Sequence, residues 1–152
     1  MTYSIVFSLP AVVRTILQDS AALADVEVLT GPRRFQGGKP SLAVQGVRAT
    51  TSRPITGGWR REDGSFTLYG HAEVRGAGED AIDEARGAVS ELLQAASDAL
   101  EADYTLGGLV MHCDVTEIAE DDQSLTDAPA GHTFTAHLTV SFTADVDPGA
   151  SS

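Results

Sequence analysis

The chain has 152 residues and a net charge of −12, and its single cysteine, Cys113, excludes an internal disulfide bond. This length suits one domain, which at this size buries about 70 % of the surface of its unfolded chain. No apolar run approaches the roughly 18 residues that a membrane-spanning helix needs. Residues 1–10 also lack the basic start and apolar core of a secretory signal, so we expect a reducing compartment and no membrane.

The charge is divided between the two halves of the sequence. Residues 1–76 contain nine basic and six acidic side chains, whereas residues 77–152 contain sixteen acidic side chains and one basic one, Arg86. Free nucleic acid is a poor partner for the acidic half, because phosphate contacts require Lys and Arg. The separation favours head-to-tail association, in which the basic loops of one subunit meet the acidic face of a neighbour. A solubility bias without any partner is the alternative.

The first half of the sequence predicts one helix and several strands. Residues 1–8 alternate and predict a short strand or an extended arm, and Ser8 is a candidate helix cap. Apolar residues at steps of three and four then predict a helix over residues 10–19. Further on, residues 42–50 predict a strand, and residues 59–74 predict a hairpin around the turn pair Asp63-Gly64.

The second half is dominated by a long amphipathic helix over residues 79–100. Its apolar stripe consists of Ile82, Ala85, Val89, Leu92, Leu93, Ala96 and Leu100. Gly87 lies inside this helix and costs about 1 kcal/mol relative to Ala, so we expect another element to approach closely there. Residues 109–118 predict a strand with Met111 and Cys113 on its apolar face. Residues 133–144 predict a second strand, in which apolar and Thr-rich positions alternate cleanly.

Together these elements predict a two-layer α+β domain. Strands that alternate apolar and polar residues suit an antiparallel or mixed sheet, here of about 4–5 strands, with two helices covering one face. The other face, rich in Thr, Ser and His, is left for water or a neighbour. We expect the domain to span residues 1–144, and residues 145–152, which show no periodicity, to form a flexible tail.

The sequence carries no strong catalytic or cofactor signature. It lacks a phosphate loop, a dinucleotide fingerprint and the HExxH and GxSxG motifs, so we expect neither an enzyme nor a cofactor. His112 and Asp114 share one strand face, and together with His71 and His137 they would bind zinc if their strands adjoined. The alternative is that these are ordinary polar positions of exposed strands. The thiol of Cys113 is expected to be buried and structural.

The candidate functional residues are charged side chains in or beside loops. Trp next to Arg is a common anchor at protein interfaces, so the basic loops are candidate contacts with a neighbouring subunit. The acidic segment after the strand at 109–118 is the candidate counterpart; solvent-exposed loops are the alternative. The tentative interface set is Arg33, Arg34, Lys39, Trp59, Arg60, Arg61, Glu120, Asp121 and Asp122.

The order of these elements resembles that of tail terminator proteins of long-tailed (siphovirus-type) bacteriophages. The resemblance covers residues 9–144 and lies in arrangement more than in letters. Its parts are a starting helix, AVVRTILQDSAALADVEV, a Gly/Pro/Arg loop, and the strands PSLAVQGVRATT and SFTLYGHAEV. A single long helix, GEDAIDEARGAVSELLQAASDAL, follows, and then come a strand, a loop and a final Thr-rich strand. The segment 55–64 with Trp59 and the acidic loop 119–132 depart from the usual pattern.

The resemblance implies a virion protein without catalytic activity. Such subunits form a hexameric ring that caps the head-proximal end of the tail tube, ends tube polymerisation and joins head-completion or connector proteins. Viral DNA passes through the bore without sequence-specific binding, and assembly takes place in the host cytoplasm. Another neck or head–tail completion protein is one alternative. A small cytoplasmic α+β enzyme or metal- or ligand-binding domain, with the His112 and Asp114 face as its site, is the other.

Overall fold

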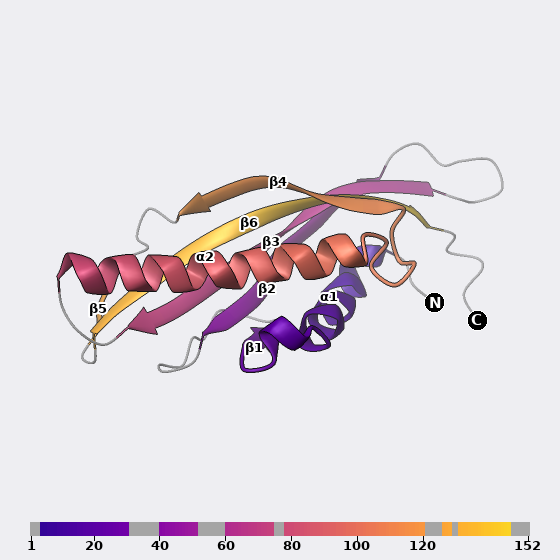
Figure 1. Cartoon of the computed structure of the whole chain (residues 1–152). Coiled ribbons are helices and arrows are strands. Elements are labelled where there is room, and N and C mark those ends of the chain that lie inside the picture. Colours follow the sequence, from indigo (N-terminus) through magenta and orange to yellow (C-terminus); the bar gives the residue numbers. More distant parts are fainter. Residues whose placement is uncertain are drawn as a thin grey trace.

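The computed structural model is a mixed β-sheet with helices on one face (Figure 1). It describes residues 4–30, 40–51, 60–74, 78–120, 126–128 and 131–146. The helices are α1 (Leu9–Gln18) and α2 (Glu79–Ala102), with 3₁₀ turns η1 (Ile5–Phe7) and η2 (Ala21–Leu23). The strands are β1 (Glu27–Leu29), β2 (Ser41–Thr51), β3 (Arg60–Val74), β4 (His112–Glu120), β5 (Thr126–Ala128) and β6 (Gly131–Val146).

The sheet has the order β1-β2-β3-β6-β4, and the short β5 pairs with β6. Strand β1 is parallel to β2, and the other pairs are antiparallel. In the part of the chain that the structure describes, β1 and β4 therefore form opposite edges. Figure 1 shows β4 along one long side of the molecule and α1 with β1 along the other. The predicted α+β architecture with a mixed sheet and two covering helices is confirmed.

Helix α2 lies along the two central strands, β3 and β6. Its buried side chains are Ala81, Ala85, Val89, Leu92, Leu93, Ala96 and Leu100. This is the predicted stripe, except that Ile82 is only half-buried and Ala81 takes the buried position. Opposite the helix lie alternate residues of β6, from Phe134 to Phe142, which are also buried. The apolar residues of α2 recur with the helical period of 3.6, and those of β6 with the strand period of 2. Each element therefore presents one apolar face, and the two faces pack together in one core.

The predicted hairpin around Asp63-Gly64 is wrong. Both residues lie inside the continuous strand β3, where Asp63 pairs with Thr50 and Thr143 on its two sides. Gly64 is required for packing: a Cβ there would overlap the carbonyl oxygen of Arg48 and lie 2.7 Å from Phe142 Cζ. An Asp-Gly pair favours a turn locally, but here its glycine allows the backbone of β2 and the ring of Phe142 to approach β3.

The close approach expected at Gly87 is not found in the part of the chain that the structure describes, since no atom of another element lies within 4 Å of a Cβ built there. The glycine that brings α2 onto the sheet is Gly70 of β3, whose Cβ position lies 3.0 Å from Leu93 Cδ2. A third glycine, Gly46, has φ +65° and coincides with a register shift of β2 against β3. Its positive φ favours glycine at this bulge.

The ends of several elements differ from the predictions. Residues 5–7 form the 3₁₀ turn η1 in place of a strand or arm, and Ser8 makes no side-chain capping bond to α1. Strand β4 begins at His112, and Met111 is 49 % exposed where the alternation placed it in the core. Strand β6 ends at Val146, whose side chain is still buried, two residues beyond the end of the strand predicted over residues 133–144.

Candidate functional site

Of the predicted interface residues, the structure describes Arg60, Arg61 and Glu120. The predicted residues Arg33, Arg34, Lys39, Trp59, Asp121 and Asp122 lie outside the described residues. Arg60 and Arg61 begin β3 and are opposite Val146 and Asp145 of β6, so they belong to a strand, not to a loop. Arg61 is already engaged within the chain, because its Nε lies 3.0 Å from Asp145 Oδ1.

Glu120 lies at the other end of the sheet. It pairs with Ala136, whereas Arg60 pairs with Val146, ten residues further along β6. At about 3.3 Å per residue these positions are separated by roughly 33 Å. The basic pair and the acidic end of β4 therefore do not contact each other within one subunit, and any pairing between them has to join two copies.

The candidate zinc ligands do not converge. His112 and Asp114 share a face, with Nε2 and Oδ2 3.7 Å apart. However, His112 pairs with Thr143, six residues from His137 along β6, which corresponds to about 20 Å. Instead, Nε2 of His137 lies 3.4 Å from Oε1 of Glu117. The His137 ring also packs at a tilt against the ring of Tyr69, with 5.5 Å between the ring centroids. Among the described residues no group of three His, Cys, Asp or Glu side chains is placed to hold a metal ion.

The thiol of Cys113 is buried on the helix-covered side of β4, as predicted. Burial is the main cause that raises the pKa of Cys113 to about 11, and the negative charges of Asp114 and Asp103 add to it. At neutral pH the sulfur is therefore a protonated thiol, which is a poor nucleophile and a poor metal ligand. This chemistry argues for a structural role.

A buried carboxylate holds the N-terminal turn on the sheet, a contact that the sequence reasoning missed. Glu62 of β3 is 2 % exposed. Its carboxylate accepts hydrogen bonds from Ser4 Oγ, at 2.7 Å, and from the backbone N–H of Ile5, at 2.9 Å. These donors lie 58 and 57 positions away in the sequence, so no local pattern points to them. The contact fixes η1 at the end of the sheet where Arg60 and Arg61 begin β3.

A groove of about 370 Å³ runs between α2 and the end of β4. Helix α2 lies over β3 and β6, so β4 extends beyond the cover that the helix provides. Ile118 is opposite Leu138 on the helix side of the sheet, yet it is 72 % exposed. Val89 and Leu93 of α2 line the opposite wall. Ile118 therefore adds an exposed apolar side chain to a groove whose other wall is formed by α2.

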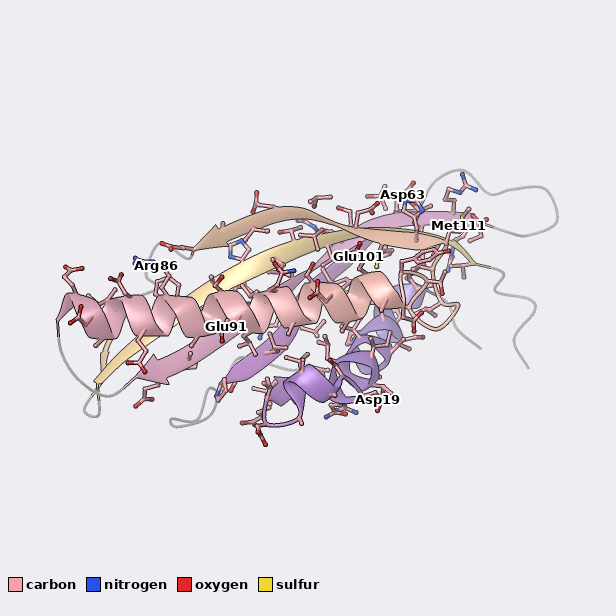
Figure 2. All side chains as sticks on the ribbon, viewed as in Figure 1. Asp19, Asp63, Arg86, Glu91, Glu101 and Met111 are labelled. Atoms are coloured by element: carbon pink, nitrogen blue, oxygen red, sulfur yellow. The ribbon has the colours of Figure 1, made fainter. Side chains whose placement is uncertain are left out.

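Arg86 of α2 lines this groove and lies beside the end of β4 (Figure 2). Its guanidinium lies 5.3 Å from the centre of the Phe134 ring, and its Nε lies 3.0 Å from Glu120 Oε1. A third contact joins its Nη1 to Asp83, one turn earlier in α2, at 3.0 Å. Arg86, the single basic residue among residues 77–152, is therefore paired with acidic side chains of the same half of the sequence.

Comparisons with known proteins support the fold. No protein-family model matches the chain, and no curated protein sequence matches it. Among solved structures, the chain is similar to a chain in the virion of a native gene transfer agent particle, with a TM-score of 0.57 and 15 % identity. The match covers 95 % of this chain and 100 % of the other. At this identity the likeness shows a shared fold over 95 % of this chain.

Within the described ranges, no helix combines the length and the apolar character needed to cross a bilayer.

Proposed function

We propose that this protein is a structural subunit of a phage-like virion, and that it acts as the tail terminator. As such it would form a ring on the head-proximal end of the tail tube, end polymerisation of the tube and join the tail to head-completion proteins. The observation that carries the proposal is the likeness to a gene transfer agent virion chain over 95 % of this chain and all of that one. The element order, which resembles tail terminators from α1 to β6, supports the finer assignment.

The charge distribution supports this role. Residues 77–152 contain sixteen acidic side chains and a single basic one. An acidic surface turned toward the bore repels the phosphates of DNA, so the nucleic acid passes without being held. The basic first half is then available for the neighbouring subunit or for the tail tube protein.

A different neck component is the second candidate, because head- or tail-completion proteins of this size share the same surroundings in the particle. The two candidates differ in what their loss does. Without a terminator, tube polymerisation has no stop, so tails grow beyond their normal length. Without a completion protein, tails keep their length but do not join heads.

A small enzyme or metal-binding domain is the candidate from another class. Its site would be the polar sheet face with His112 and Asp114, where the described side chains lie along the strands and form no convergent cluster. Zinc titration tests it directly: a stoichiometric, tight response that is lost in His112→Ala would overturn the structural assignment.

The decisive experiment removes the gene from the phage or phage-like particle that encodes the chain and measures tail lengths by electron microscopy. Overlong tails, restored to normal by the wild-type gene, are the expected result. Tails of normal length that are detached from heads would favour the completion protein. Unchanged, infectious or transfer-competent particles would overturn both assignments.

A further inference from the structure

The N-terminal turn is fastened to the sheet at one carboxylate. Glu62 of β3 accepts hydrogen bonds from Ser4 Oγ, at 2.7 Å, and from the backbone N–H of Ile5, at 2.9 Å. Among the described residues, no other group donates a hydrogen bond to this carboxylate, and no Lys or Arg side chain forms an ion pair with it. The turn therefore supplies both donors of a side chain whose residue is only 2 % exposed.

The same carboxylate also favours release of the turn. An ionised carboxylate has about four acceptor sites, and its burial without a cation or a full set of donors costs free energy. Two donors serve Glu62 while the turn is in place. Once the turn has left, water can serve every site of the carboxylate. Hydration of Glu62 thus offsets part of the loss of the two hydrogen bonds.

Few apolar side chains oppose this release. Within the turn Ile5 is buried, whereas Phe7 is 78 % exposed and covers little of the core. Ser8, which joins η1 to α1, makes no side-chain capping bond to the helix. The helix that follows has a buried face of its own, which begins at Leu9. Residues 4–8 are consequently held by contacts that α1 does not need in order to stay on the sheet.

We propose that residues 4–8 form a strap with a closed and an open state, and that the strap opens while the rest of the domain stays folded. Segments with few buried apolar contacts open at a lower free energy than the whole domain. Opening uncovers the Glu62 carboxylate and the part of the core that Ile5 covers, at the end of the sheet where β3 begins. A partner that binds only this uncovered end shifts the subunit toward the open state. The strap is a property of the isolated chain and does not depend on the proposed role in the tail.

Native-state hydrogen exchange of the full-length chain, followed by NMR, tests the strap. We expect the N–H of Ile5, which is bonded to Glu62, to exchange about tenfold or more faster than the slowest amides of β3 and β6. Low concentrations of urea should leave the rate at Ile5 unchanged, because opening the strap exposes little surface, and should accelerate the slowest amides. The same rate and the same urea dependence at Ile5 and at the slowest amides would overturn the proposal.

A core variant separates local from global opening. Val89→Ala of α2 removes buried methyl groups, since Val89 is 1 % exposed, and leaves the contacts of the strap in place. Circular dichroism checks that this variant is folded. We expect its slowest amides to exchange faster than those of the wild type, while the rate at Ile5 stays the same. If the rate at Ile5 rises by the same factor as the others, the turn opens only when the whole domain unfolds, and the strap does not exist.

A serine pair tests the fastening. Ser4→Ala removes the hydroxyl that donates to Glu62 and accepts from the N–H of Val6, so we expect exchange at Ile5 to become about tenfold faster. Ser8→Ala is the matched control, because Ser8 belongs to the same turn and its side chain makes no capping bond. We expect the control to exchange like the wild type. Equal rates at Ile5 in both variants would show that the Glu62 contact does not hold the strap closed.

Discussion

Phe142 of β6 packs its ring against Gly64 of β3, with Phe142 Cζ only 2.7 Å from the place a Cβ at Gly64 would occupy. The two residues are direct partners across the strands. On the other side of β3, Gly64 pairs with Ala49 of β2. Three adjacent strands therefore depend on the absence of one side chain.

Gly64→Ala is expected to destabilise the fold by about 1–3 kcal/mol, the usual cost of forcing extra atoms into a packed core. The cost arises because backbone, the carbonyl of Arg48, would have to move as well as the Phe142 ring. Urea unfolding measures it. Gly87→Ala is the control: the site is open and helical, so this change should stabilise by about 0.5–1 kcal/mol. Equal effects of the two changes would contradict the packing described for Gly64.

Elements with one periodic apolar face are predicted well from the sequence, and contacts between distant residues are not. The alternation of β6 and, except at Ile82, the apolar stripe of α2 agree with the prediction, because each element buries one periodic face against one layer. The turn predicted at Asp63-Gly64 is wrong. The local preference of this pair for a turn is overridden because Asp63 pairs with Thr50 of β2 and Thr143 of β6 inside a continuous strand. Residues that touch across long sequence separations leave no local signal.

Ser4→Ala is expected to cost about 1–3 kcal/mol of unfolding free energy, because it removes a donor from the buried carboxylate of Glu62. Glu62→Gln keeps the shape of the side chain but removes its negative charge, and we expect it to lower the unfolding free energy by a similar amount. Thermal and urea unfolding give both values. Thr143→Val is the control: it removes a hydroxyl bond of 2.8 Å to exposed Asp63, and we expect less than 1 kcal/mol. A Ser4→Ala variant as stable as the wild type would refute the anchoring role of Glu62.

Cys113 is expected to react slowly with iodoacetamide in the native protein. Its pKa is raised from 9.0 to about 11, so below pH 9 the thiolate fraction is roughly a hundredfold smaller than in the unfolded chain. The raised pKa also links folding to pH. Its contribution to stability is complete below pH 9 and is lost as pH rises toward about 11. Alkylation rates at pH 8, with and without urea, test this, and equal rates would show that the thiol is not buried.

The candidate site was only partly accessible from the sequence. The unequal charge of the two halves is a property of composition, so the expectation of head-to-tail contacts needed no coordinates. The groove beside Ile118 depends on α2 lying over β3 and β6, so that the Ile118 end of β4 extends beyond the helix. The β-bulge between Val115 and Glu117 shifts the alternation, so Ile118 lies on the helix side with Cys113. Helix placement and bulges are tertiary features without a short sequence pattern.

Reversing the basic charges Arg33, Arg34 and Lys39 to Glu is expected to weaken self-association, and the residual association should lose its dependence on salt. Exposed charges attract within about a Debye length, which falls from about 10 Å at 0.1 M salt to about 3 Å at 1 M. Sedimentation velocity at both salt concentrations measures the effect. Arg61→Glu is the control, because Asp145 of the same chain already binds the Arg61 guanidinium and raises its pKa. We expect that variant to retain most of the wild-type association. If it fails to assemble while the triple variant assembles normally, the contact lies at the start of β3 and not in residues 33–39.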